Sequence, residues 1–502
     1  MNDYQPSYDD LKIELDYMKQ YVDQLRYQIA ELKRNRFGSR SEKFDNPMQN
    51  ILDFNETNDP IDVTGMPELE AEIPSHKRKK KSRSTKELPK RIEIIPVDEA
   101  DRQCACGETR KFIRYEVSEK IDYHPATFEF VEERREVVAC KKACDHSIIM
   151  AKVPERMLPK VPVTDSLLAH IIVSKCDDRQ PLNHLEQQFS SRNGVNIPRQ
   201  SMSRWFIKSA SPLMPILNAL KESVIDYNIS SRDATTLQVL NEPDRKATTK
   251  SYVYCFRGGD PGKESIIYEN NEKEHKKFVK DWFDGFSGAV HSDADSFFNG
   301  LYAREDVWPL LCNAHARRKY EAITKTSLKE GLAHEAMCFY SQLYKIEKMA
   351  KAKNYSPEQI KQIRQEKSLP LLVKFKAMLE EKSPLVPPKS PIAQAINYTL
   401  RHWDGLIRYC EDGRYSIDNN HTEREIKPFV IARKNFMFSA SQEGARALCL
   451  HFSLIRSAKL HKLDPYRYYV EIMKKVPYCE KVEDYEALLP WNINLEKVIS
   501  KD

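Results

Sequence analysis

A change of hydrophobic period near Asn228 constrains the fold of this chain more than any other feature. Before that residue the apolar positions follow a helical period, whereas "NISSRDATTLQVL", "SYVYCFRG" and "ESIIYEN" have the patterns of strands. A helical stretch, "EKEHKKFVKDWF", then precedes a fourth strand in "GAVHSDAD" and, after a short helical piece, a fifth in "DVWPLLC". Three meandering strands, a helix, a strand, a helix and a strand predict a mixed α/β sheet.

This order of elements is that of a ribonuclease-H-like fold, and it places two carboxylates on neighbouring strands. Asp233 falls on the first strand and Asp293 at the end of the fourth. The twist of the sheet can bring them together, but such a pair is unfavourable without cations. Two divalent ions about 3.5–4 Å apart relieve the repulsion, activate a water or a 3′-hydroxyl, and stabilise the leaving oxygen of a phosphoryl displacement. Oxygen ligands favour Mg²⁺ or Mn²⁺ over zinc.

A third carboxylate ligand is a candidate in "SIDNNHTEREIKPFVIARKNF". The polar residues 418–420 suit the start of a helix, which puts Glu423 in its first turns. Glu425 lies about 200° further round that helix, so the two glutamates cannot both face one site. Glu423 is therefore either a catalytic ligand or a surface charge, because Thr422 and Glu425 also fit a capping box and glutamates are common in first turns.

A lysine-rich helical insertion, residues 321–410, separates the fifth strand from this helix. It either contacts DNA or braces the helix that bears Glu423. Just before it, "CNAHARRKYEA" offers Cys312 and His315 at a metal-ligand spacing, although a helix starting after the fifth strand explains both. Four basic side chains are expected to contact phosphates near the active site, unless they are merely solvated: Arg317, Arg318, Arg433 and Lys434.

The N-terminal region carries two patterns of its own. Apolar residues from Leu11 to Leu32 step by four and three, which predicts a coiled coil over residues 1–45 and hence self-association, the alternative being a helix docked on its own chain. Residues 46–100 are expected to be a disordered linker, acidic first and then basic in "HKRKKKSRSTKELPKR". We expect the basic run to contact nucleic-acid phosphates, although it can also be a solvated spacer.

Two pairs of cysteines, Cys104 with Cys106 and Cys140 with Cys144, enclose alternating segments. They predict a zinc-finger-like domain over residues 101–150, in which structural Zn²⁺ replaces the core that so short a piece lacks. The C-x-C spacing is tighter than the usual C-x2-C, His146 can replace one thiolate, and ordinary buried cysteines are the alternative. The chain has eleven cysteines, and this odd number argues against a disulfide framework.

Residues 158–226 read as helices, and "PLNHLEQQFSSRNGVNIPRQSMSRWF" reads as a helix, a turn at Gly194 and a second helix. This is the outline of a helix-turn-helix, although any small helical bundle gives the same pattern. In that outline Arg199 and Arg204 face DNA, beside Gln200 and Ser203. The inward positions are Leu185, Phe189, Ile197, Met202 and Trp205.

The apolar pattern and the N-terminal residues bear on where the protein is expected to reside. There is no apolar run of about 18 residues or more, and the N-terminus is polar and acidic, so neither a transmembrane span nor a secretory signal is expected. We expect a cytoplasmic protein. The net charge of +6 is small for this length, so the position of the charge is more informative than its sum.

Together these stretches resemble, over almost the whole chain, the transposases of the insertion-sequence-66 family, bacterial mobile-element proteins of the DDE superfamily. The resemblance rests on "RFGSRSEKF", the paired cysteines, "CNAHARRKYEA", "DNNHTEREIKPFVIARKNFMFSASQEGA" and "LHKLDPYRYY". It implies a catalytic domain over residues 227–445, a C-terminal helical segment over 446–502, and a metal-binding catalytic triad of Asp233, Asp293 and Glu423.

The resemblance implies a DNA transposase that binds the terminal inverted repeats of its element as a homo-oligomer, cuts them with metal-activated water and joins them to target DNA. Such a protein associates with the nucleoid when bound to DNA, and family elements often encode accessory proteins. Two departures leave an inactive or domesticated DNA-binding protein as the alternative. "DAT" replaces the common D-E-T, and "SDAD" replaces T-D-G-Y, which makes Asp295 a competitor of Asp293.

Overall fold

The computed structural model describes residues 18, 21–22, 127–129, 131–139, 148–159, 161–242, 245–246, 248–271, 275–294, 298–326 and 331–495. The chain divides into two units, residues 39–127 and the remainder, and the structure below belongs to the second unit. Met18, Tyr21 and Val22 are helical, but the rest of the predicted coiled coil, the linker over 46–100 and the four finger cysteines lie outside the described residues. No described helix is both long enough and apolar enough to span a bilayer.

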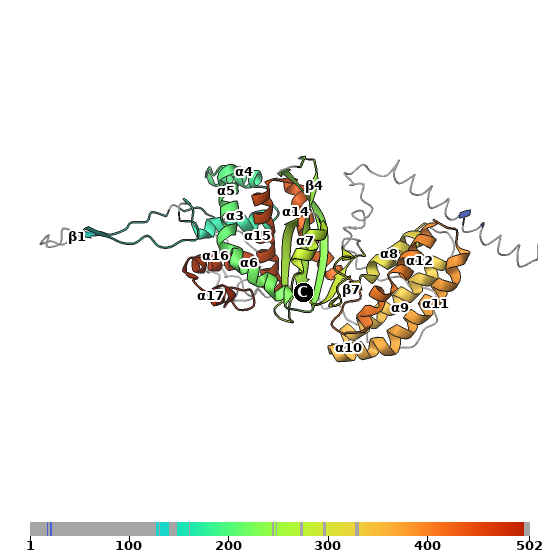
Figure 1. Ribbon diagram of the computed structural model, residues 1–502. Coiled ribbons are helices and arrows are strands. Elements are labelled where there is room, and N and C mark those ends of the chain that lie inside the picture. Colours follow the sequence, from blue (N-terminus) through green and yellow to red (C-terminus); the bar gives the residue numbers. More distant parts are fainter. Residues whose placement is uncertain are drawn as a thin grey trace, which may run out of the picture. The chain divides into compact units, whose positions relative to one another are not determined.

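A six-stranded mixed sheet organises the second unit (Figure 1). The strands run in the order β5-β4-β3-β6-β7, with β8 beside β3. The β3–β4 and β4–β5 pairs are antiparallel, whereas β6 and β8 pair parallel to β3 and β7 pairs parallel to β6. The predicted mixed sheet is therefore confirmed. The strand bounds are β3 Ile229–Asn241, β4 Lys250–Gly258, β5 Ser265–Asn271, β6 Gly288–Ser292, β7 Val307–Leu311 and β8 Phe438–Ser441.

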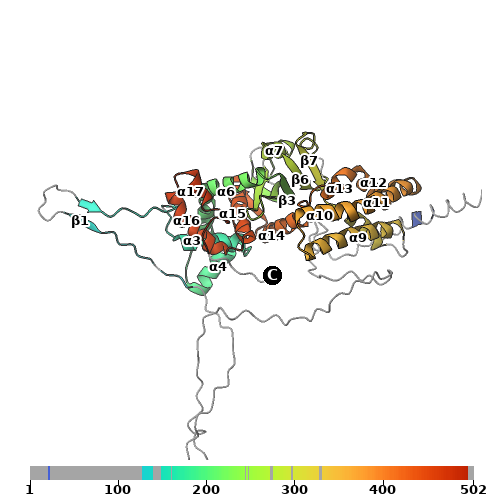
Figure 2. The ribbon, with the colours of Figure 1, turned by 90° about the horizontal axis from the view of Figure 1, so that it is seen from below.

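Two helices cover opposite faces of this sheet, α7 (His275–Trp282) and α14 (Asn420–Phe436) (Figure 2). Phe256 of β4 stacks on Trp282 of α7 with ring centroids 3.5 Å apart. Asp233 pairs in register with Cys255, the neighbour of Phe256. Because side chains alternate along a strand and directly opposite residues share a face, Asp233 points away from α7 and toward the face that α14 covers.

One edge of β3 is shared by two partners. Its N-terminal end pairs with β6 and its C-terminal end with β8, and residues 232–237 lie between the two pairings. Backbone groups there need other partners. Asn419 Nδ2 donates to the Arg232 carbonyl oxygen at 2.7 Å, and Arg433 donates to the Thr236 carbonyl oxygen. Helix α14 is thus fixed to β3 near both of its ends.

Helices that precede the sheet in the sequence and helices that follow it share its main hydrophobic core. Before it come α3 (Asp165–Cys176) and α6 (Ala210–Ile225), and after it come α15 (Gln442–Leu460), α16 (Pro465–Lys475) and the short α17 (Val482–Glu486). Leu213, Leu450 and Ile472 are among the fully buried members. The C-terminal helices therefore pack into the same core as the sheet.

Helices α4 (Leu182–Asn193) and α5 (Arg199–Lys208) form the pair expected from the sequence. Gly194 ends α4 with a positive φ of 66°, and its N–H and that of Val195 donate to carbonyls of the last turn. The predicted inward residues are confirmed, since Leu185, Phe189, Ile197 and Met202 form a small buried cluster against which Trp205 packs. A separate antiparallel pair, β1 (Val137–Ala139) and β2 (Ile148–Met150), lies upstream.

The insertion folds as helices around a second hydrophobic core, to which β6 and β7 also contribute (Figure 1). Its helices are interrupted at "KNYSPEQ" (353–359) and at "SPLVPPKSP" (383–391). Tyr320, Tyr340 and Phe375 pack against one another in that core. The bounds are α8 Asn313–Thr324, α9 Leu332–Ala352, α10 Pro357–Ile363, a π-helical turn Arg364–Ser368, α11 Leu369–Lys382, α12 Pro391–Arg401 and α13 Trp403–Ile407.

Helix α15 satisfies the outer edge of strand β5 through serine side chains. Ser457 Oγ accepts from the Ile266 N–H at 3.0 Å and donates to the Ile266 carbonyl at 3.1 Å, and Ser453 Oγ accepts from the Tyr268 N–H at 2.7 Å. An edge strand otherwise presents unpaired backbone groups that can pair with another chain. Helix α15 therefore also closes one side of the sheet.

Replacing Ser457 by alanine is expected to destabilise the protein by about 1–3 kcal/mol, because the buried Ile266 N–H loses its acceptor. Chemical unfolding followed by tryptophan fluorescence measures the change. Ser211→Ala, at an exposed position of α6, is the matched control and is expected to change stability by no more than about 0.5 kcal/mol. Equal effects of the two substitutions would contradict the role assigned to Ser457.

Candidate active site

Asp233 and Asp293 lie close together on the face of the sheet covered by α14. Asp233 is part of β3 and accepts a hydrogen bond from the Ala234 N–H at 2.7 Å, and Asp293 directly follows β6. The pKa of Asp233 is raised to about 8, mainly by burial and also by the nearby carboxylates of Asp293 and Glu423, while the Ala234 N–H opposes the rise. Three carboxyl groups distant in sequence therefore share one electrostatic environment.

Glu423 reaches this environment because α14 is fixed along the edge of β3. The helix begins at Asn420, after the N-cap residue Asn419, and Glu423 stands in its first turn. A carboxylate is favoured there by the positive end of the helix dipole. Asn419 is buried, and besides its bond to Arg232 its N–H donates to Cys312 Sγ at 3.2 Å. These two contacts join the start of α14 to β3 and to the residue that precedes α8.

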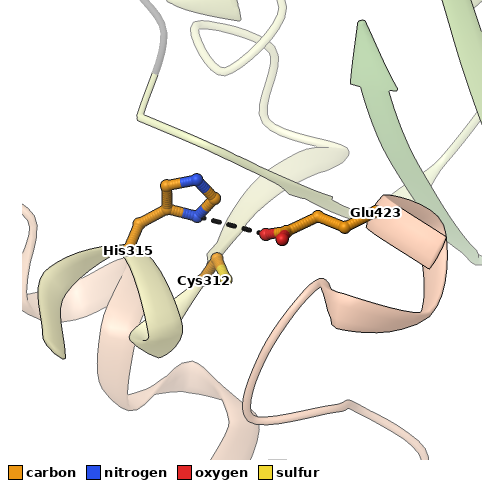
Figure 3. Close-up of side chains that lie close together, drawn as sticks. All are labelled: Cys312, His315 and Glu423. Carbon is orange, nitrogen blue, oxygen red and sulfur yellow. Dashed lines mark ion pairs between the residues drawn. The ribbon is translucent and has the colours of Figure 1, made fainter. Parts of the chain in front are cut away.

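His315 and Arg318, one turn apart on α8, contact the carboxylates. His315 Nδ1 lies 3.0 Å from Asp293 Oδ1 and 3.7 Å from Glu423 Oε1, and Arg318 donates to Glu423 Oε2 at 2.6 Å. Figure 3 shows the imidazole of His315 and the carboxylate of Glu423 facing each other. Asp293 and Glu423 are thus both within reach of one imidazole nitrogen.

Cys312 belongs to the same cluster, since its Sγ and ligand atoms of His315 and Glu423 lie within 4.8 Å of one another. Cys312 is buried at the N-cap of α8, and burial raises the pKa of its thiol to about 12. Its sulfur already accepts the hydrogen bond from Asn419. The two interpretations of "CNAHARRKYEA" are therefore compatible, because a helix starts there and the same residues also face the carboxylates.

Glu425 points away from the site, as its position round the helix predicts. Arg456 of α15 donates to Glu425 Oε2 at 2.7 Å, and the Tyr268 hydroxyl donates to the Glu425 carbonyl oxygen. The alternative capping box of Thr422 and Glu425 is wrong, because the helix already begins at Asn420 and the Glu425 side chain is engaged elsewhere.

The basic residues named from the sequence have different surroundings. Arg318 forms an ion pair with Glu423, and Arg317 Nη1 lies 3.6 Å from Glu321 Oε2. Arg433 is only 7% exposed and donates to Thr236 Oγ1 at 2.7 Å, so it serves the packing of α14 on β3 instead of presenting a free surface to DNA. The remaining three, Lys434, Arg199 and Arg204, are exposed. Asp295 lies outside the described residues.

The insertion braces the segment that leads to Glu423. The Tyr344 hydroxyl of α9 donates to Asp418 Oδ2 at 3.0 Å, and Asn313 Nδ2 donates to the Leu406 carbonyl at 2.8 Å and to the Ile417 carbonyl at 3.3 Å. Of the two roles left open for the insertion, bracing is thus supported by direct contacts.

Sequence reasoning missed the roles of two residues. Asn419 was expected only to help start a helix, although it joins α14, β3 and Cys312. Arg318 was expected to meet a phosphate, although it holds Glu423. The available signal for Asn419 was the run of two asparagines after Asp418, because a buried helix start needs side-chain partners.

The donor set fits divalent cations. Glu423 Oε1 is buried and has no hydrogen-bond partner, and burial together with the neighbouring carboxylates raises the pKa of Asp233, so a bound cation would favour the charged form of all three groups. Carboxylate oxygens are the ligands that Mg²⁺ and Mn²⁺ prefer. Asp233, Asp293 and Glu423 therefore form a candidate metal centre able to support phosphoryl transfer.

Metal affinity is expected to depend on pH because Asp233 must lose a proton to bind a cation. With a pKa of about 8, Asp233 is protonated at pH 6, so metal binding there releases a proton. Apparent Mn²⁺ affinity should rise by up to about tenfold per pH unit from pH 6 and level off above pH 8. Calorimetric titration in buffers of different ionisation enthalpy measures both affinity and proton release. An affinity that stays constant from pH 6 to pH 8 would contradict this assignment.

Comparisons with known proteins extend these observations. Residues 160–447 match a family model described as "Transposase IS66 family", and residues 453–491 match one described as "IS66 C-terminal element". Residues 24–97 match "Transposase C of IS166 homeodomain", and residues 101–145 match "zinc-finger binding domain of transposase IS66".

Relatives from Sinorhizobium fredii (strain NBRC 101917 / NGR234) are similar over nearly their whole lengths. The uncharacterized protein y4jD is 29% identical over 98% of this chain and 98% of its own. The uncharacterized protein y4qI is 27% identical over 94% of this chain and 89% of its own.

Proposed function

The chain belongs to the IS66 family of transposases, and from this membership and the site geometry we propose that it is an active DNA transposase. It binds the terminal inverted repeats of its element, cleaves their 3′ ends and joins them to target DNA. The proposal rests chiefly on one observation, the convergence of Asp293 and Glu423 on His315 Nδ1, at 3.0 and 3.7 Å, with Asp233 beside them. Asp293, not Asp295, is proposed as the second ligand because it holds the motif position.

We assign the catalytic domain to the ribonuclease-H-like fold. The strand order and the directions of β3–β7 support this assignment, as do one carboxylate on β3 and another directly after the neighbouring strand β6. The third carboxylate comes from a helix that follows the insertion. We propose residues 227–445 as the catalytic domain, with the insertion over 321–410, and residues 158–226 and 446–502 as the helical segments that pack with it.

Asp233, Asp293 and Glu423 would hold two Mg²⁺ or Mn²⁺ ions, which activate the attacking oxygen and stabilise the leaving oxygen of an in-line displacement. Arg318 fixes Glu423 through Oε2, which leaves Oε1 directed toward His315 and Asp293. The attachments of α14 to β3 keep the carboxylates together before any ligand arrives, which lowers the entropic cost of assembling the site. Water or a 3′-hydroxyl attacks phosphorus, and the bond to the leaving 3′-oxygen breaks.

Other segments are proposed to bind DNA and to assemble the protein. The match over residues 101–145 supports structural zinc, for which we propose Cys104, Cys106, Cys140 and Cys144 as ligands. Exposed Arg199 and Arg204 on α5 are proposed to contact the element end. Lys434 and Arg317 are proposed to contact phosphates near the site, and a coiled coil within residues 1–45 to form the homo-oligomer.

Strand transfer tests the proposal. The purified full chain is incubated with a labelled duplex that carries the element end and with supercoiled target DNA. We expect joined products with Mg²⁺ or Mn²⁺, their loss with EDTA and their return when the metal is restored. Specific end binding without any cleavage or joining, under conditions in which a characterised DDE transposase is active, would instead favour the inactive, domesticated alternative.

A further inference from the structure

The surroundings of His315 are not explained by its contacts with the carboxylates alone. Its Nδ1 is buried and lacks a hydrogen-bond partner, although Asp293 Oδ1 is only 3.0 Å away, because the geometry between them is not that of a hydrogen bond. A buried polar atom without a partner costs free energy unless something outside the chain completes it. The imidazole is therefore poised toward a group that arrives with a ligand.

The other ring nitrogen defines what Nδ1 can do. Arg318 Nη1 lies 3.3 Å from His315 Nε2 in hydrogen-bonding geometry, and an arginine can only donate. Nε2 must therefore accept, which places a hydrogen on Nδ1.

A nitrogen that bears a hydrogen cannot bind a metal ion, so Nδ1 needs an acceptor. Asp293 Oδ1 does not accept from it in hydrogen-bonding geometry, so an oxygen of the substrate can supply the acceptor. Non-bridging phosphate oxygens gather charge in the transition state of phosphoryl transfer and are good acceptors there. Metal binding by Cys312 and His315 together is not favoured, because the Cys312 sulfur is buried and already accepts a hydrogen bond from Asn419.

We propose that His315 is a further catalytic residue, whose Nδ1–H donates a hydrogen bond to a non-bridging oxygen of the scissile phosphate. Arg318 positions it by fixing both the Glu423 carboxylate and the imidazole tautomer. This inference rests on the proposed transposase function. His315 belongs to α8 and is not one of the three carboxylate ligands.

Two substitutions of His315 with side chains of nearly equal shape distinguish a hydrogen-bond donor from a metal ligand at this position. In His315→Asn the side-chain amide can occupy the place of Nδ1 and still donate, whereas in His315→Asp a carboxylate there can only accept or bind metal. We expect single-turnover strand transfer to fall by about 10²–10³-fold in His315→Asp and in His315→Ala, and by less than about tenfold in His315→Asn. End binding, measured by fluorescence anisotropy, should stay within about threefold of wild type in all three.

A matched control exists on α14. His421 and Arg424 form the same His-x-x-Arg pair, with 3.0 Å between Arg424 Nη2 and His421 Nδ1, but His421 is exposed. His421→Ala should leave the strand-transfer rate within about threefold of wild type. A similar loss in both histidine variants would overturn the specific role of His315.

Pulsed electron paramagnetic resonance of bound Mn²⁺ provides a readout apart from activity. We expect no ¹⁴N coupling from a directly bound imidazole in the wild type. A coupling that disappears in His315→Ala would make His315 a metal ligand and overturn the proposal, as would an active His315→Asp with an inactive His315→Asn. Unchanged activity in all His315 variants would also overturn it while leaving the transposase function intact, whereas failure of that function would show as no strand transfer by the wild type.

Discussion

Replacing Asp233 or Asp293 by asparagine, or Glu423 by glutamine, is expected to lower strand transfer by at least about 10³-fold. Each substitution removes a charged ligand from the proposed metal centre, whose stabilisation of the transition state amounts to several kcal/mol. Binding of the element end should change little, because these side chains lie on the covered face of the sheet and in the first turn of α14. Single-turnover strand transfer and fluorescence anisotropy separate the two quantities.

The matched control is Glu425→Gln on the same helix. Glu425 is as inaccessible as Glu423, with 13% and 14% of the side chain exposed, but it pairs with Arg456 instead of facing the aspartates. We expect its variant to retain strand transfer within about tenfold of wild type after correction for folded protein. If the Glu425 variant loses as much activity as the Glu423 variant, the carboxylate of Glu423 has no special role.

Substitution of Arg364 by methionine is expected to destabilise the insertion by about 3–5 kcal/mol. Arg364 is 3% exposed and donates to both carboxylate oxygens of Glu347, at 2.9 and 2.6 Å, and to the carbonyls of Tyr409 and Asp412. Its loss leaves a largely buried carboxylate and two backbone acceptors without their donor. Hydrogen exchange of α9 and α11 measures the local free energy of opening.

Lys376→Met is the control for that experiment. Lys376 and Glu380 lie 3.9 Å apart with about half of each side chain exposed, and such surface pairs contribute about 0–1 kcal/mol. Exchange in α11 should therefore change little. An effect of Lys376→Met equal to that of Arg364→Met would mean that the buried contacts of Arg364 add nothing beyond a surface charge.

The strands β3 to β7 could be predicted from the sequence because each is a run of five or more residues with its own apolar pattern. Strand β8 was not predicted, since "FSAS" has no such pattern and exists only because β3 offers it a free edge. For the same reason the burial of Arg433 could not be foreseen. Its partners Thr235 and Thr236 lie nearly two hundred positions away, and local propensity carries no information about them.

The candidate site was predictable in its residue types but not in its supports. The position of Asp293 at the end of the fourth strand and the polar residues that start the helix of Glu423 are local features of the sequence, so both residues could be named from it. The contacts that make the site specific join residues 105 and 74 positions apart, in the pairs of Arg318 with Glu423 and of Tyr344 with Asp418. Spacing alone also could not tell whether the side chains of "CNAHARRKYEA" serve a helix start, a metal or a substrate, because that depends on the direction of the His315 ring.

X-ray diffraction from crystals of the protein grown with Mn²⁺ tests the central claim most directly. The anomalous difference map identifies manganese without reference to any assumed ligand. We predict a peak bonded to carboxylate oxygens of Asp233, Asp293 and Glu423, at about 2.0–2.3 Å from each ligand atom. Manganese bound elsewhere while these three carboxylates remain without it would contradict the account.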